Sequence, residues 1–150
     1  MSELRDLYQE LILDHNKNPR NFREMAEATH QADGHNPLCG DRIRIYLKVV
    51  DDRIADVAFK GSGCAISQSS ASLMTTFLKG KTVFEARELF QHFHDLVTGH
   101  PVSPEKLAEL GKLAVFEGVQ EFPTRVKCAS LAWHTLVSAL EGDSDLTTTE

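Results

Sequence analysis

At 150 residues the chain is long enough for one domain with a substantial core, and its 41% hydrophobic and 25% charged residues are ordinary for a globular protein. A formal net charge of −6 argues against a general nucleic-acid-binding protein, because such proteins carry a basic balance. No apolar run approaches the length of a membrane span, and the first residues carry no signal-peptide pattern, so we expect a cytoplasmic protein without a membrane partner.

The first half of the chain predicts one helix followed by strands. Apolar residues recur at helical spacing from Leu4 to Asn16, whereas residues 25–34 are weakly patterned and fit an edge strand. From Ile43 to Val49 apolar and polar residues alternate, and a second such run follows a short turn, from Ile54 to Lys60. These two runs predict a hairpin, whose second strand we expect the segment Gly61-Ser62-Gly63 to break.

The second half predicts helices. Their expected ranges are Ser67–Lys79, Thr82–Val97 with a Thr82–Glu85 capping box, a short helical region from Ser103 to about Val119, and Thr124–Glu141. The order of helix, strands and helices predicts an α+β fold in which a small antiparallel sheet of about three strands packs against several helices. We expect a single domain over residues 1–142 and a polar, frayed tail over residues 143–150.

Three cysteines in loop-like settings are the candidate functional residues. Cys39 and Cys64 lie at turns that flank the hairpin, so both can reach one end of the sheet, and Cys128 falls in the first turns of the last helix. An odd cysteine count without a secretion signal predicts reduced thiols, available for metal or sulfur chemistry. Asp41 either caps a turn or supplies a carboxylate. Three thiolates and one carboxylate are enough to complete a tetrahedral metal site.

Other interpretations of the cysteines stay open. A single free cysteine is more often a small buried hydrophobe than a ligand, and the chain has no Cys-x-x-Cys pair. A binding module with structural zinc is one alternative. A cysteine hydrolase with Cys64 as nucleophile is another, although no histidine has a setting that marks it as the base. His92 and His94 are two apart on a helix and face different ways, and for all seven histidines a solvated or packed role is the better interpretation.

Ordered motifs surround the three cysteines. They are Asn36-Pro37-Leu38-Cys39-Gly40-Asp41, Gly61-Ser62-Gly63-Cys64-Ala65-Ile66-Ser67 and Arg125-Val126-Lys127-Cys128-Ala129-Ser130-Leu131. With these motifs, and with its N-terminal segment up to Asn18-Pro19-Arg20-Asn21, the sequence resembles the U-type family of iron–sulfur cluster assembly, which includes IscU, the N-terminal part of NifU and SufU. The resemblance covers almost the whole chain except the tail, and it implies a single-domain SufE/IscU-like fold.

Departures from IscU indicate the SufU branch. IscU proteins carry histidine immediately before the third cysteine, where this chain has Lys127. They also carry a Leu-Pro-Pro-Val-Lys chaperone-binding segment, where this chain has Glu121-Phe122-Pro123-Thr124-Arg125, which argues against loading by a dedicated Hsp70-type chaperone. The segment between Cys64 and Cys128 is also longer than in IscU, with the extra part around Phe90 to Pro104.

The resemblance implies zinc bound by Cys39, Asp41, Cys64 and Cys128, and a cysteine desulfurase of the SufS kind as partner, with SUF assembly or acceptor proteins downstream. We expect Cys39 to accept the persulfide, because Gly40 and its loop allow movement. Arg125 and Lys127 are placed to offset the negative charge of the ligands. The sequence thus predicts a zinc-dependent, sulfurtransferase-like protein of iron–sulfur cluster assembly. The alternative is a non-enzymatic scaffold that builds a [2Fe–2S] cluster from iron and sulfur on the same ligands.

Overall fold

A computed structural model of the protein describes residues 2–142 and 147–148, in which helices pack on a small sheet. The elements in chain order are α1 (Ser2–Lys17), β1 (His30–Asn36), β2 (Asp41–Val50), β3 (Arg53–Ser62), α2 (Ala65–Leu78), α3 (Val83–Thr98), α4 (Pro104–Leu110), the 3-10 helix η1 (Gly111–Glu121), α5 (Pro123–Glu141) and β4 (Thr147–Thr148). The predicted α+β class is therefore confirmed.

The sheet has the strand order β3-β2-β1-β4, and its first three strands are antiparallel, as predicted. Alternation is confirmed over the first part of β2: Ile43 and Ile45 are buried, while Arg42 and Arg44 face outward. Tyr46, expected on the outward face, is buried instead, in a small cluster with Met25 and Ala58. The short strand β4 was not predicted; it pairs in parallel with the end of β1. The prediction of a frayed tail over residues 143–150 falls largely outside the described residues and stays a prediction.

Two expected strand boundaries were wrong. The edge strand begins at His30 and not at residue 25. The strand β3 does not end at Lys60 but continues through Gly61 to Ser62, since Gly61 still pairs with Ile43. A Cβ at Gly61 would lie 3.0 Å from the Cα of Ile43, so glycine permits this close pairing. The extended strand leaves only Gly63 between the sheet and Cys64.

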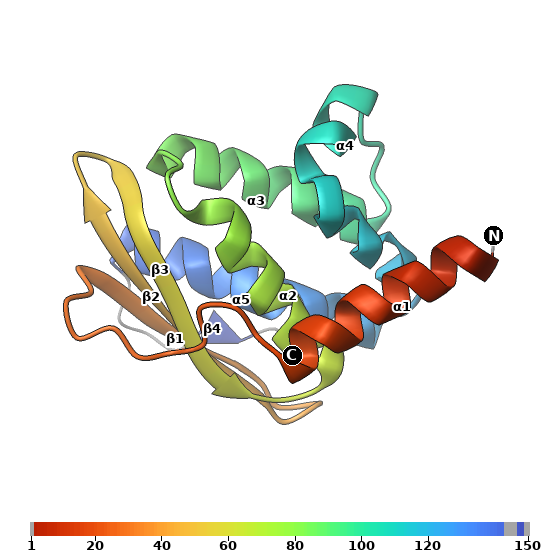
Figure 1. The fold of residues 1–150 in the computed structure, drawn as a ribbon, viewed down its shortest axis with the longest axis horizontal. Helices are drawn as coiled ribbons and strands as arrows, with labels where there is room; N and C mark the ends of the chain where they lie inside the picture. The colour runs from red at the N-terminus through yellow and green to blue at the C-terminus, as the bar shows by residue number, and fades with distance from the viewer. Residues whose placement is uncertain (1, 143–146, 149–150) are drawn as a thin grey trace.

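Helices cover the buried face of the sheet. The helix α5 packs across β1 and β2, and α2 packs on β3, so these two helices are the ones nearest the sheet (Figure 1). Trp133 of α5 is fully buried and stacks on Phe93 of α3, with ring centroids 4.4 Å apart. The last helix thereby lies at the centre of the molecule and carries Cys128 on a rigid support.

Small hydroxyl side chains fix α2 between its neighbours. The Ser70 hydroxyl donates to the carbonyl of Ala129 at 2.6 Å and accepts from the indole N–H of Trp133 at 3.1 Å. On the other side of α2, Ser72 Oγ lies 2.7 Å from Nδ1 of the buried His15 in α1. Because α2 begins right after Cys64, these contacts also fix the position of Cys64 relative to Cys128.

The helices begin and end within two residues of where the sequence predicted, with one exception. The Thr82–Glu85 capping box is present, and α3 ends at Thr98, followed by Gly99 with a φ of 81°. The helical region after Ser103 divides into α4 and the 3-10 helix η1, because Gly111 has a φ of 51° that an α-helix does not adopt. No helix in the described part of the chain is long and apolar enough to cross a membrane.

Candidate metal centre

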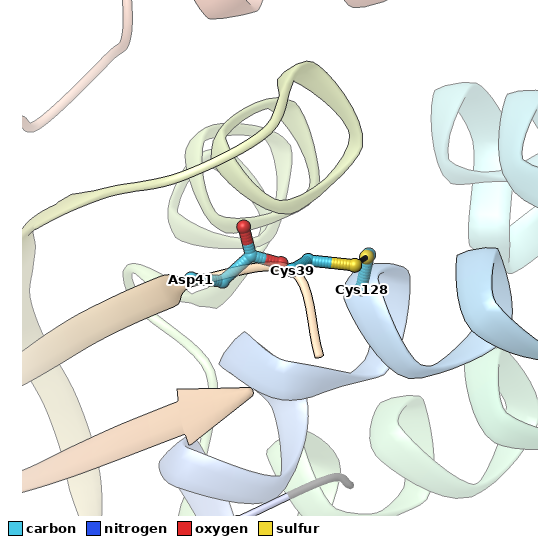
Figure 2. Close-up of side chains that lie close together, drawn as sticks. All are labelled: Cys39, Asp41 and Cys128. Atoms are coloured by element: carbon cyan, nitrogen blue, oxygen red, sulfur yellow. Dashed lines mark hydrogen bonds between the residues drawn. The ribbon is translucent and has the colours of Figure 1, made fainter. Parts of the chain in front are cut away.

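Three chain segments meet at one end of the sheet. The loop between β1 and β2 carries Cys39, Cys64 is the N-cap residue of α2, and Cys128 lies in the second turn of α5. The hairpin geometry expected from the sequence therefore does bring the three cysteines toward one place. Figure 2 shows Cys39 and Cys128 with their sulfur atoms facing each other, beside Asp41 at the start of β2.

The ligand atoms of Cys39, Asp41 and Cys128 all lie within 4.8 Å of one another. Their two sulfur atoms are 3.2 Å apart (Figure 2). Cys64 lies next to this group, with its Sγ 3.7 Å from Oδ2 of Asp41. Among the residues that the structure describes, this is the only such cluster of three or more metal-ligating side chains.

Asp41 is fully buried, and both of its carboxylate oxygens contact Cys64. Its Oδ1 accepts a hydrogen bond of 2.8 Å from the backbone N–H of Cys64, and its Oδ2 faces the Cys64 sulfur. Gly63 makes room for the carboxylate, since a Cβ there would lie 2.9 Å from the Asp41 Cγ. The sequence left open whether Asp41 caps a turn or offers a ligand. The geometry allows both roles: Oδ1 binds the backbone N–H of Cys64, and Oδ2 is placed to bind a metal ion.

Cys128 is the buried member of the cluster. Burial raises the pKa of its thiol well above the ordinary value, and hydrogen bonding to Cys39 and the nearness of Cys64 raise it further. Several thiols held this close cannot all ionise without a compensating cation, because like charges oppose one another. A bound divalent cation removes that cost.

Asn36 is a member of the site that the sequence analysis quoted in a motif but gave no role. It is fully buried at the end of β1, and its Nδ2 donates to Cys128 Sγ at 3.7 Å. Its Oδ1 accepts from the backbone N–H of Leu38 at 3.2 Å. Asparagine side chains often accept a hydrogen bond from the backbone N–H two residues further on, in a turn. Asn36 before the Pro37–Leu38 turn was therefore a sequence signal that could have pointed to this role.

Accessibility differs among the three thiols. Cys39 is exposed, Cys64 is half-buried and Cys128 is buried. Gly40, next to Cys39, has a φ of 70°, a conformation that favours glycine, and nothing lies within 4 Å of where its Cβ would be. Cys39 is therefore the thiol that another molecule reaches most easily.

The donor set fits Zn²⁺. Thiolate sulfur and carboxylate oxygen are both established zinc donors, and a tetrahedral ion needs four of them. The ligand atoms of Cys39, Asp41 and Cys128 already lie close together, and the sulfur of Cys64 contacts the carboxylate of Asp41. The buried thiols, together with the buried carboxylate, also supply the negative charge that a divalent cation requires.

Arg125 and Lys127 flank Cys128 on α5 as the sequence indicated. The exposed Arg125 lies over the ring of Phe122, 4.5 Å from its centroid, and Lys127 is half-buried. In the described part of the chain neither forms an ion pair with a carboxylate. Their role in balancing the charge of the site stays a prediction.

Two of the histidines pack against another aromatic ring. Phe90 contacts both His94 and His134, with ring centroids 5.8 and 5.3 Å away, and burial lowers the pKa of His134. Within the described residues, the hydrogen-bonding contacts of the Cys64 sulfur go to Asp41 and Ser67, and none goes to a histidine. This arrangement argues against the cysteine hydrolase.

Comparisons with known proteins find relatives across most of the chain. The family model described as the NifU-like N terminal domain matches residues 7–129. The zinc-dependent sulfurtransferase SufU of Bacillus subtilis is 40% identical over 135 residues, which cover 90% of each chain. The iron–sulfur cluster assembly scaffold protein IscU of Streptococcus pyogenes is 38% identical over 141 residues, covering 94% of this chain and 87% of that one.

A solved structure shares the fold. The crystal structure of a putative iron–sulfur cluster assembly scaffold protein for the SUF system, from Fervidobacterium islandicum, superposes with a TM-score of 0.82. Its sequence is 36% identical, and the match covers 87% of this chain and 94% of that chain.

Proposed function

This chain belongs to the family of NifU-like N-terminal domains, and we propose that it is an iron–sulfur cluster assembly protein that accepts sulfur as a persulfide at a zinc-dependent thiol site. One observation carries the proposal: an exposed thiol, Cys39, lies 3.2 Å from the buried thiol of Cys128 and beside the buried carboxylate of Asp41. Its relative in Bacillus subtilis is named a zinc-dependent sulfurtransferase.

Four residues would hold the zinc ion, namely Cys39, Asp41, Cys64 and Cys128. When bound, Zn²⁺ keeps its thiol ligands deprotonated at neutral pH and takes no part in redox chemistry. Cys64 and Cys128 are fixed on two helices that pack together through Ser70, so they are suited to remain in place.

Cys39 is the proposed sulfur acceptor. Its thiolate attacks the terminal sulfur of a persulfide on the donor protein, so a new sulfur–sulfur bond forms on Cys39. The sulfur–sulfur bond of the donor breaks, and the donor cysteine leaves as a thiolate. Of the three thiols only that of Cys39 is exposed, and the loop at Gly40 lets it move toward a partner.

The donor that fits this chemistry is a cysteine desulfurase of the SufS kind, which forms a persulfide and releases alanine. Arg125 and Lys127 would offset the negative charge of the ligand set while the partner is bound. The accepted sulfur would pass on to SUF assembly or acceptor proteins. The chain therefore acts as a sulfurtransferase-like carrier.

A second candidate function is a scaffold for a [2Fe–2S] cluster. The relative in Streptococcus pyogenes is named a scaffold protein, and three thiols with one carboxylate are also suitable ligands for a cluster. Lys127, where IscU proteins carry histidine, favours the sulfur-transfer function, because it removes a nitrogen donor next to Cys128.

The proposed function is tested by alanine release from cysteine in the presence of a SufS-type desulfurase. The zinc-loaded protein is expected to accelerate release, and Cys39→Ser is expected to abolish the acceleration. Asn21→Asp, a change remote from the thiols, serves as the control and should accelerate normally. Normal acceleration by Cys39→Ser would refute the assignment of the acceptor, and no acceleration by the unaltered protein would refute the function.

A further inference from the structure

We propose that Asn36 is a positioning residue of the sulfur-transfer site, which holds Cys128 in place and fixes the start of the loop that carries Cys39. This inference rests on the proposed function of the same site. It adds a residue that is neither a zinc ligand nor the acceptor.

A single buried side chain joins the two segments. Asn36 is fully buried, and its amide N–H donates to the sulfur of Cys128, 92 positions away in the sequence. The amide oxygen of the same side chain accepts from the backbone N–H of Leu38, immediately before Cys39. The loop and the helix α5 are thereby linked through one amide group.

Only an amide side chain of this length can make both hydrogen bonds. The oxygen must accept from Leu38, and the nitrogen must donate to the sulfur of Cys128. An aspartate at this position would keep the acceptor but place an oxygen against the sulfur. It would also lie opposite Asp41, with which Asn36 is paired across the β1–β2 ladder, and so add a second buried negative charge.

This link gives two of the thiols different roles: Cys39 moves and Cys128 stays in place. When Cys39 swings toward a donor, the N–H of Leu38 stays bound to Asn36, so the movement begins only beyond residue 38. Cys128 keeps its hydrogen bond throughout, because the donor amide lies on β1 and does not belong to the loop. Asn36 thus sets the reach of the acceptor and keeps Cys128 as a retained ligand.

The test compares Asn36→Asp with Asn21→Asp. Asn21 is a matched control, since its Nδ2 also donates one hydrogen bond, to Thr75 at 2.9 Å, and the change adds the same charge away from the thiols. Zinc affinity is measured by competition with a chelator, and the thiolate-to-metal absorption bands are recorded after substitution with Co²⁺. Replacing a residue that hydrogen-bonds a metal ligand typically lowers affinity about 10- to 100-fold, so we expect that loss in Asn36→Asp and no loss in the control.

The outcomes separate this inference from the proposed function. Wild-type affinity and unshifted cobalt bands in Asn36→Asp would overturn the role of Asn36, even if that variant were less stable. An unaltered protein that bound no zinc would overturn the proposed function, and this role with it. If Asn36→Asp does not fold, Asn36→Ser replaces it. Its hydroxyl accepts from Leu38 in the same kind of turn but is too short to reach Cys128, so the same loss of affinity is expected.

Discussion

Gly63→Ala perturbs the site without replacing any of the four proposed ligands. A Cβ on residue 63 would lie 2.9 Å from the Cγ and 3.1 Å from the Cα of Asp41, and closer still to its Oδ1. The Cα belongs to a paired strand and does not yield easily, so the carboxylate has to turn away. That movement breaks the 2.8 Å hydrogen bond that Oδ1 accepts from the N–H of Cys64.

The expected cost follows from these contacts. A hydrogen bond to a charged group is worth about 1.5–3 kcal/mol, and overpacking a tight site typically adds about 1–3 kcal/mol. We therefore expect the free energy of unfolding of the zinc-free protein to fall by about 3–5 kcal/mol. For a domain of this size, that corresponds to a drop in Tm of about 6–20 °C. Zinc affinity should fall as well, since Oδ2 moves with the carboxylate.

The assay is thermal and urea unfolding of zinc-free protein, followed by zinc competition with a chelator. Gly118→Ala is the matched control, because an added Cβ there meets nothing within 4 Å, and it should change stability by no more than about 1 kcal/mol. If Gly63→Ala unfolds like the control and binds zinc like the unaltered protein, the carboxylate cradle described for Asp41 is wrong.

Three further predictions concern the same fold. Asp41→Ala should retain part of its zinc through the remaining thiols but lose most desulfurase-coupled alanine release; wild-type release would show that Asp41 only caps a turn. Burial holds the pKa of His15 below its ordinary value of 6.5, so its neutral ring stabilises the fold above that pH, and this contribution is lost as the pH falls below 6.5. Urea unfolding between about pH 5 and 7 should therefore show a shallower pH dependence in His15→Gln, and an unchanged slope would contradict the role of His15. Removal of zinc followed by the thiol oxidant diamide should join Cys39 to Cys128, whose sulfurs are 3.2 Å apart, and a different disulfide in the tryptic peptides would count against this geometry.

Local sequence signals predicted most of the fold correctly. The Thr82–Glu85 capping box is a contact between residues three apart, so the sequence alone specifies where α3 begins. The alternation of Ile43 and Ile45 with Arg42 and Arg44 likewise reflects the two faces of a single strand. The weak pattern of residues 25–34 carried no such signal, and its strand boundary was misplaced because pairing with β2 defines it.

The site was predictable in its residue types but not in its contacts. Three cysteines in turns beside glycine suggested the cluster, and Cys39, Asp41 and Cys128 do converge. The hydrogen bond from Asn36 to Cys128 spans 92 positions, and no local pattern encodes such a contact. For the same reason β4 could not be predicted, since it pairs with β1, which is far from it in the sequence.

The central claim is that Cys39 accepts the sulfur, and mass spectrometry of the persulfide tests it most directly. Trypsin cuts after arginine and lysine, so the three cysteines fall in separate peptides: residues 24–42, 61–79 and 128–150. The zinc-loaded protein is mixed with a persulfidated SufS-type desulfurase, its thiols are alkylated and the peptides are analysed. We predict one added sulfur atom on the peptide of residues 24–42. An added sulfur found instead on the peptide of residues 61–79 or 128–150 would contradict the account.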